Sequence, residues 1–279
     1  MKRLIVVSLF IVSCIVGFGV TTCNAKTVEV SSPDGAVTVA VGVNARQPYY
    51  TVSYQGRELV KPSRLGFLLD DGTLGSNTKI GCVTKDSKNE TWTQLWGEDE
   101  TVSNHYNELT VRFNEQSGRQ MHVVFRVFND GFGFRYILPE VLAGKTYCIQ
   151  DELTEITLAH DAKAWSIPSN HTEYFEGIYK ADLLSQKDTV CTPLTIEYEK
   201  DLFLAIHEAA LEDYASINLT PRVGEAGGVR LLTALTPWQN GVKVYAKGEL
   251  KSPWRTMIIS KTAGGLLTSR LMLNLNEPS

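Results

Sequence analysis

Cysteine is scarce in this chain, and its few cysteines show no pattern. Five cysteines occur in 279 residues, without a CxxC spacing and without a histidine at metal-ligand spacing. Cys14 and Cys23 lie in an N-terminal leader, which leaves Cys82, Cys148 and Cys191. An odd number of dispersed cysteines argues against a disulfide framework, and a chain of this size is stable on its hydrophobic core alone.

Basic residues are too few for a protein that binds nucleic acid. The chain has 27 lysines and arginines against 31 aspartates and glutamates, a net charge of −4. Without residues 1–25 the balance is 25 to 31, a net charge of −6. The chain also lacks the GxSxG, HExxH, P-loop and GxGxxG motifs, so no local pattern supports a hydrolase, protease or nucleotide-binding site.

One long uncharged run is present, and it lies at the N-terminus. Lys2 and Arg3 precede an uncharged stretch over Leu4–Val20, which is followed by small residues over Thr21–Ala25. This layout is typical of a secretory signal peptide cleaved after Ala25, and it predicts a secreted, periplasmic or cell-surface protein with no other membrane contact. A retained membrane anchor, or lipidation at Cys14 or Cys23, stays open.

The strongest local signal is a β-hairpin over Arg119–Tyr136. Two runs of alternating apolar residues meet at Asn129-Asp130-Gly131, a turn sequence that favours hairpins. Both faces of the hairpin are mostly apolar, whereas a sheet with one wet face would show a polar residue at every second position. The hairpin therefore belongs to a large antiparallel sheet that is covered on both sides.

The rest of the chain predicts an all-β fold. Short strand patterns and turn signals continue from Lys26, and no stretch of a dozen residues keeps a helical period. We expect about fifteen to eighteen strands in one domain over residues 26–279, arranged as a large antiparallel two-sheet super-sandwich. A blade repeat, which a propeller would need, is absent. Ala209–Tyr214 is interpreted as a strand corner and Leu266–Asn276 as a strand.

Two groups of carboxylates are candidates for chemistry. Glu173 and Glu176 lie among aromatic residues in a loop just after His171, as expected of a Ca²⁺ ligand or of a residue that contacts sugar. The alternative is a surface loop with solvated glutamates. Glu208, beside His207, lies in an apolar strand pattern, where a carboxylate usually pairs with an arginine. Arg126, Arg135 and Arg255, in similar patterns, need such partners, and Glu212 and Asp213 complete the second group.

Several longer segments together resemble one family. They are SPDGAVTVAV (32–41), SRLGF (63–67), WGEDETVSNHYNEL (96–109), FRVFNDGFGFRY (125–136), HEAALEDY (207–214), SPWRTMIIS (252–260) and NLNEPS (274–279). Taken in this order, they resemble the N-terminal domain of glycoside hydrolase family 97. The resemblance covers nearly all of the chain after the leader.

This resemblance implies part of a secreted α-glucosidase or α-galactosidase. The family combines an N-terminal super-sandwich of galactose mutarotase-like architecture, a central (β/α)₈ barrel with the catalytic acids, and a small C-terminal β domain. It acts on α-linked oligosaccharides, some members retaining and others inverting, and uses a Ca²⁺ ion shared between domains. By resemblance Glu176 is the calcium ligand contributed by this domain, with Glu173 as the fallback.

The same resemblance implies that no catalytic residue lies in this chain. The sequence keeps its apolar pattern almost to Ser279, where the barrel would begin, and we expect a longer protein that was cut at a domain border. Such a domain should expose an apolar patch toward the barrel. Two alternatives remain. A sugar epimerase would need a histidine and a carboxylate converging in a cleft. A free-standing carbohydrate-binding module would be supported by exposed tryptophans among Trp92, Trp96, Trp165, Trp238 and Trp254.

Overall fold

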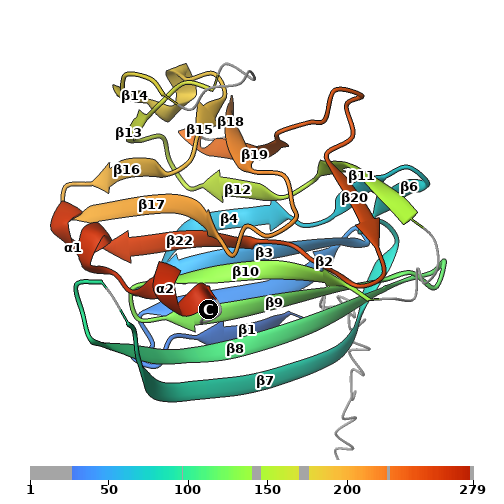
Figure 1. Cartoon of the computed structure of the whole chain (residues 1–279), viewed down its shortest axis with the longest axis horizontal. Helices are drawn as coiled ribbons and strands as arrows, with labels where there is room; N and C mark the ends of the chain where they lie inside the picture. The colour runs from blue at the N-terminus through green and yellow to red at the C-terminus, as the bar shows by residue number, and fades with distance from the viewer. Residues whose placement is uncertain (1–26, 96, 140–145, 170–175, 225–226, 277–279) are drawn as a thin grey trace, which may run out of the picture.

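A computed structural model describes residues 27–95, 97–139, 146–169, 176–224 and 227–276. The leader, with its expected signal peptide, lies outside these ranges. Within them most residues lie in β-strands that form antiparallel pairs, so the all-β expectation is confirmed (Figure 1). The described residues form 22 strands, more than the fifteen to eighteen expected, because several strands have only two to four residues.

One large sheet has eight strands. In sheet order they are β1 (Val28–Ser31), β2 (Val37–Asn44), β3 (Gln47–Tyr54), β4 (Arg57–Arg64), β12 (Glu155–Leu158), β19 (Val229–Leu235), β18 (Ile217–Val223) and β15 (Val190–Cys191). The first four follow one another along the chain as a meander. The alternating burial of β2 and β3 shows that one face of this part of the sheet is turned to the core.

The other large sheet has ten strands. In sheet order they are β14 (Lys180–Leu183), β13 (Lys163–Ser166), β16 (Leu194–Glu199), β17 (Leu202–Ala209), β22 (Trp254–Ser260), β10 (Gly131–Leu138), β9 (Gln120–Phe128), β8 (Thr101–Glu115) and β7 (Thr78–Thr93), with β21 (Leu250–Lys251) paired to β10. A four-stranded sheet contains β20 (Val244–Lys247), β11 (Thr146–Glu152), β5 (Phe67–Leu69) and β6 (Gly72–Leu74). The segment after β14 forms a 3₁₀ turn, η2 (Leu184–Gln186).

The two large sheets share one hydrophobic core. The ring of Tyr50, on β3, lies 5.8 Å from the ring of Phe125 on β9 and 5.1 Å from that of Phe134 on β10, centroid to centroid. The continuous core cluster runs from Val30 near the start of the described chain to Ile259 in β22. Contact between inner faces across two antiparallel sheets is the arrangement expected of a super-sandwich.

The predicted hairpin is β9–β10. Phe128 pairs with Gly131, so Asn129 and Asp130 form the two-residue turn. Gly131 has a φ of 147°, and a Cβ atom at this position would lie 2.1 Å from the carbonyl oxygen of Met257. Only glycine fits here, because both the backbone conformation and the approach of β22 exclude a side chain.

The segment predicted as a strand over Leu266–Asn276 is instead helical, and that expectation was wrong. It contains the second half of α1 (Ala263–Thr268), whose first turn is capped by the Thr262 hydroxyl accepting from Gly265 N, and all of α2 (Leu271–Leu275). In Figure 1, α1 lies at the left-hand end of β17 and β22, and α2 lies in front of β22 and β10. None of the helices in the described residues is long and apolar enough to cross a membrane.

Helix α2 packs directly on the central hairpin. Leu271 and Leu275 are buried against the outer face of the ten-stranded sheet, where a Cβ atom on Gly133 would lie only 2.5 Å from Leu275 Cδ1. Asn274 accepts a hydrogen bond from the Trp92 indole at 2.9 Å and donates one to the Ser103 carbonyl at 2.8 Å. The hairpin is therefore covered on both faces, as its apolar pattern predicts.

Candidate functional site

The β13–β14 hairpin is the first candidate site, because it leads into and out of the loop that carries the predicted calcium ligands. Strand β14 is the edge strand of the ten-stranded sheet. Lys163 pairs with Leu183 and Trp165 with Ala181, so these four residues share one face of the hairpin. Ala164 and Ser166, on the opposite face, are buried.

The chain on each side of the loop is held firmly. Beyond β13, Ile167 accepts a hydrogen bond from the backbone N–H of Cys191 at 2.9 Å, and Ser169 N–H donates to the Thr189 carbonyl at 2.9 Å. On the other side, a Cβ atom on Gly177 would lie 2.6 Å from Ile167 Cγ2. Glycine thus permits the returning chain to pass close to the outgoing one.

Large apolar side chains are exposed at this edge. The exposed fractions are 42% for Trp165, 86% for Ile178, 56% for Tyr179 and 43% for Leu183. We call these four residues the β13–β14 apolar patch. The Lys163 ammonium lies 4.7 Å from the Trp165 ring centroid, a cation–π contact on the same face. An apolar cluster on an edge strand is a feature of interaction surfaces.

Of the predicted calcium ligands, Glu176 lies in the described chain and is exposed beside Gly177. Glu173 and His171 lie outside the described residues. In the part of the chain that the structure describes, no group of three or more histidine, cysteine, aspartate or glutamate side chains is placed to hold a metal ion. Ca²⁺ takes six to eight oxygen ligands, which is more than the Glu176 carboxylate alone can supply.

The second predicted carboxylate, Glu208, is buried and paired with an arginine as expected. Its carboxylate accepts from Arg255 at 2.8 Å and from Ile217 N–H at 3.0 Å. Burial raises the pKa of the Glu208 carboxyl, and the nearby Arg255 charge only partly opposes this. The adjacent His207 bonds Thr192 Oγ1 at 3.0 Å, and burial lowers its pKa.

Arg255 is the centre of this buried ion cluster. Its guanidinium also donates two hydrogen bonds to Glu152, at 3.0 and 2.6 Å. Tyr214 and Thr154 hydroxyls donate to the same carboxylate. Because every partner is satisfied, the cluster is structural. Consecutive strand residues point to opposite faces, so His207 and Glu208 do not form the convergent pair an epimerase would need.

The other two strand arginines also have partners. Arg126 donates to Glu108 at 2.8 Å, and its guanidinium lies over the rings of Tyr106 and Trp254. The Arg135 guanidinium also lies over the Trp254 ring, 4.5 Å from the ring centroid. Trp254 is therefore buried under cations and is not a surface tryptophan.

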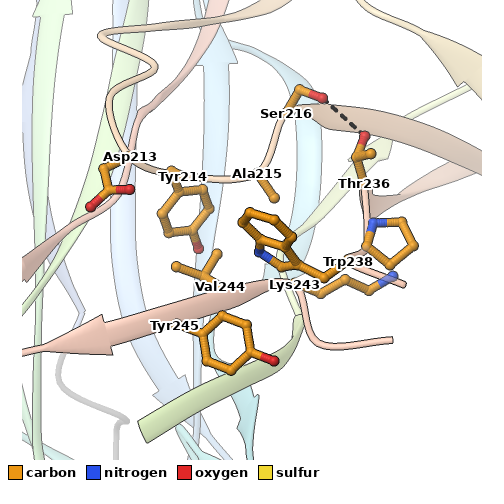
Figure 2. Close-up of a pocket in the computed structure, with 10 residues that line it drawn as sticks. Asp213, Tyr214, Ala215, Ser216, Thr236, Trp238, Lys243, Val244 and Tyr245 are labelled. Carbon is orange, nitrogen blue, oxygen red and sulfur yellow. Dashed lines mark hydrogen bonds between the residues drawn. The ribbon is translucent and has the colours of Figure 1, made fainter. Parts of the chain in front are cut away.

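A separate pocket of about 390 Å³ lies between the eight-stranded and four-stranded sheets. It is lined by Asp213, Tyr214, Ala215, Ser216, Thr236, Pro237, Trp238, Lys243, Val244 and Tyr245 (Figure 2). Trp238 is 63% exposed and Tyr245 47%, and their ring centroids are 6.3 Å apart at an angle of 57°. Sequence reasoning named Trp238 only as one of several tryptophans that exposure would make relevant to sugar binding.

The fold defines the chain as a β super-sandwich domain. The family model described as "Glycosyl-hydrolase 97 N-terminal" matches residues 30–278. The chain belongs to this family and is the N-terminal domain of a family 97 glycoside hydrolase.

Solved structures support the same assignment. A family 97 enzyme from Pseudoalteromonas sp. strain K8, solved in complex with acarbose, is 35% identical with a TM-score of 0.85, over 90% of this chain and 38% of that chain. A β-arabinopyranosidase is 25% identical with a TM-score of 0.74, over 84% of this chain and 40% of its own.

A curated relative matches in sequence. The retaining alpha-galactosidase of Bacteroides thetaiotaomicron is 25% identical over 280 residues, which cover 91% of this chain and 42% of that protein. The chain thus spans less than half the length of the relatives it matches.

Proposed function

We propose that this chain is the non-catalytic domain of a secreted α-glycosidase, where it supports a (β/α)₈ catalytic barrel, completes the rim of the substrate pocket and donates one calcium ligand. The observation that supports this proposal is the β13–β14 apolar patch, which lies at the β14 edge of the ten-stranded sheet and includes Ile178 and Tyr179, close to Glu176 in the chain. The patch supplies apolar contact area and the glutamate supplies an oxygen ligand, so one partner surface can use both.

The energetics favour a protein partner at the patch. Complete burial of a large apolar side chain contributes about 1.5–3 kcal/mol. Ile178 and Tyr179 are more than half exposed, so most of this contribution is unused in the chain alone. Trp165 is well suited to the centre of an interface, because a rigid aromatic ring provides a large contact area at low entropic cost.

Glu176 is the ligand we favour for calcium, and Glu173 is the fallback. The close approach of Gly177 to Ile167 fixes the backbone next to Glu176, so its exposed carboxylate projects from a defined position. The barrel would supply the remaining oxygen ligands. The substrate class is an α-linked oligosaccharide, because relatives include an alpha-galactosidase and an enzyme solved with acarbose. The leader supports a secreted, periplasmic or cell-surface location.

A domain exchange tests this function. Residues 27–276 replace the corresponding domain of the Pseudoalteromonas family 97 enzyme, and α-glycosidase activity and Ca²⁺ affinity are measured. We expect an active enzyme in which Glu176→Gln weakens Ca²⁺ binding by on the order of tenfold. Glu173→Gln tests the fallback, and Glu197→Gln, an exposed carboxylate of β16, is the matched control.

The two parts of the proposal fail separately. If neither Glu176→Gln nor Glu173→Gln changes the Ca²⁺ affinity, the domain donates no calcium ligand. If Ile178→Ser combined with Tyr179→Ser leaves the activity and the melting temperature of the chimera unchanged, the patch does not support the barrel.

A further inference from the structure

Trp238 and Tyr245 form an exposed aromatic platform in the pocket between the eight-stranded and four-stranded sheets. Trp238 follows β19 and Tyr245 belongs to β20, so the two rings come from opposite ends of one connection. We call the cavity that they line the Trp238 pocket. Its volume of about 390 Å³ lies in the range of small-molecule sites.

The rest of the lining combines apolar surface with hydroxyl and charged groups. The Ser216 and Thr236 hydroxyls share one hydrogen bond of 2.9 Å, dashed in Figure 2, and each keeps capacity for another. Lys243 adds three donors and Asp213 adds acceptors. A ligand with both apolar faces and many hydroxyl groups matches this lining, and carbohydrate rings have that character.

The backbone turn that carries Trp238 is held in place before any ligand binds. The backbone N–H of Trp238 donates to the Val242 carbonyl at 2.8 Å. The backbone N–H of Gly241 donates to the Trp238 carbonyl at 2.8 Å, which closes a tight turn. The Asn240 amide donates to the Tyr245 hydroxyl and ties the turn to β20. Little ordering entropy would therefore be lost on binding.

The angle between the rings selects the shape of the sugar chain. Both rings of a coplanar pair can lie flat against an extended β-linked ribbon. The rings of Trp238 and Tyr245 meet at 57°, so both can stack only on a chain that turns between successive sugar units. α-Linked glucans curve in this way.

We propose that the Trp238 pocket is an accessory site that binds a curved, α-linked oligosaccharide. It lies apart in the topology from the β13–β14 apolar patch, because the patch belongs to the ten-stranded sheet. The inference goes beyond the proposed function, since the site needs neither the barrel nor calcium. Binding here would hold the substrate polymer near the enzyme without cleaving it.

Titration calorimetry on the full chain tests the site, with maltoheptaose as the probe and cellohexaose as the comparison. We expect maltoheptaose to bind at least about tenfold more tightly than cellohexaose. Trp238→Ala and Tyr245→Ala should each weaken maltoheptaose binding by about tenfold or more. Trp165→Ala is the matched control, because it removes an exposed tryptophan from the other surface.

Three results would overturn the proposal. The first is that maltoheptaose at about 10 mM produces neither heat nor chemical-shift changes in the indole N–H resonances. The second is that Trp238→Ala binds maltoheptaose as tightly as the unchanged chain does, or that Trp165→Ala loses as much affinity for maltoheptaose as Trp238→Ala. The third is equal affinity for the two oligosaccharides. Thermal unfolding of each variant confirms that it is folded, and all measurements use the chain without a catalytic domain, so failure of barrel docking does not affect them.

Discussion

The buried ion cluster and the β13–β14 apolar patch reverse the usual distribution of side chains. Arg255 and Glu152 are charged, yet their side chains are 2% and 0% exposed. Ile178 is apolar, yet it is 86% exposed. The difference shows how each region is stabilised: the charges are satisfied within this domain, whereas the apolar patch has no covering surface in the described residues.

The ion cluster also joins distant parts of the chain. Glu152 ends β11 of the four-stranded sheet, while Glu208 and Arg255 lie on neighbouring strands of the ten-stranded sheet. Their hydrogen bonds therefore fix one sheet against another. The patch makes no such connection, so its residues are free to serve a partner.

The largest expected effect comes from breaking the ion cluster. Arg255→Met leaves Glu152 and Glu208 buried without their cation, so we expect the free energy of unfolding to fall by about 3–5 kcal/mol. Urea denaturation measures this. Arg57→Met removes the exposed Arg57–Glu199 pair and should cost less than about 1 kcal/mol. Similar losses in the two variants would contradict the comparison.

The next effect is a pH dependence carried by Glu208. Because burial raises its pKa above the ordinary value of 4.5, its stabilising contribution is complete below pH 4.5 and is lost as the pH rises through the folded-state pKa. The stability of Glu208→Gln relative to the unchanged chain should therefore increase as the pH rises above the ordinary carboxyl pKa of 4.5.

An exposed glutamate provides the opposite control for that pH series. The hydrogen bond from Arg57 lowers the pKa of Glu199, so its contribution is present above the ordinary value and is lost as the pH falls. Glu199→Gln should therefore become slightly less stable relative to the unchanged chain as the pH rises. Parallel pH profiles for the two variants would refute the burial argument.

A smaller effect is expected at the base of the loop that carries Glu176. Gly177→Ala forces a methyl group against Ile167 and should lower the unfolding free energy by about 1 kcal/mol. Gly264→Ala, in α1 with open space around it, should instead raise stability by about 0.5–1 kcal/mol. Thermal denaturation of both variants checks the opposite signs.

The smallest effect on stability is expected in the apolar patch itself. Ile178→Ser should change the free energy of unfolding by no more than about 0.5 kcal/mol, because its side chain is largely solvated already. Self-association measured by light scattering should fall, since less apolar surface is exposed. A large loss of stability would show that the patch belongs to the core.

Much of the fold was predictable because its signals are local. Strand alternation and the turn at Asn129–Asp130 identified the β9–β10 hairpin, and its two apolar faces indicated a covered sheet. The arginine partner of Glu208 was also expected, because an isolated carboxylate in an apolar strand requires one. The identity of the second carboxylate was not predictable, since Glu152 lies 103 residues from Arg255 in sequence.

The C-terminal segment shows how a local pattern misleads. Leu271, Leu273 and Leu275 alternate as in a strand, but Leu271 and Leu275 also stand one helical turn apart. The structure buries these two and exposes Leu273 by 37%. Whether the segment forms a helix or a strand depends on the room that Gly133, which has no side chain, leaves for Leu275. The apolar pattern of one segment does not reveal this contact with another strand.

The small contact area of α2 means that the outer layer can open independently of the sandwich core. The helix has five residues and contacts the sheet through Leu271, Leu275, Asn274 and the Met272 sulfur, while the flanking Arg270 and Asn276 bond Asp99 and the Ala210 N–H. If α2 briefly left the sheet, the outer face of β9 and β10 would be exposed to solvent, while the aromatic contacts on the inner face would stay intact. Amide protons in the helix would then exchange with solvent well before those of β9 and β10, so one domain contains two levels of protection.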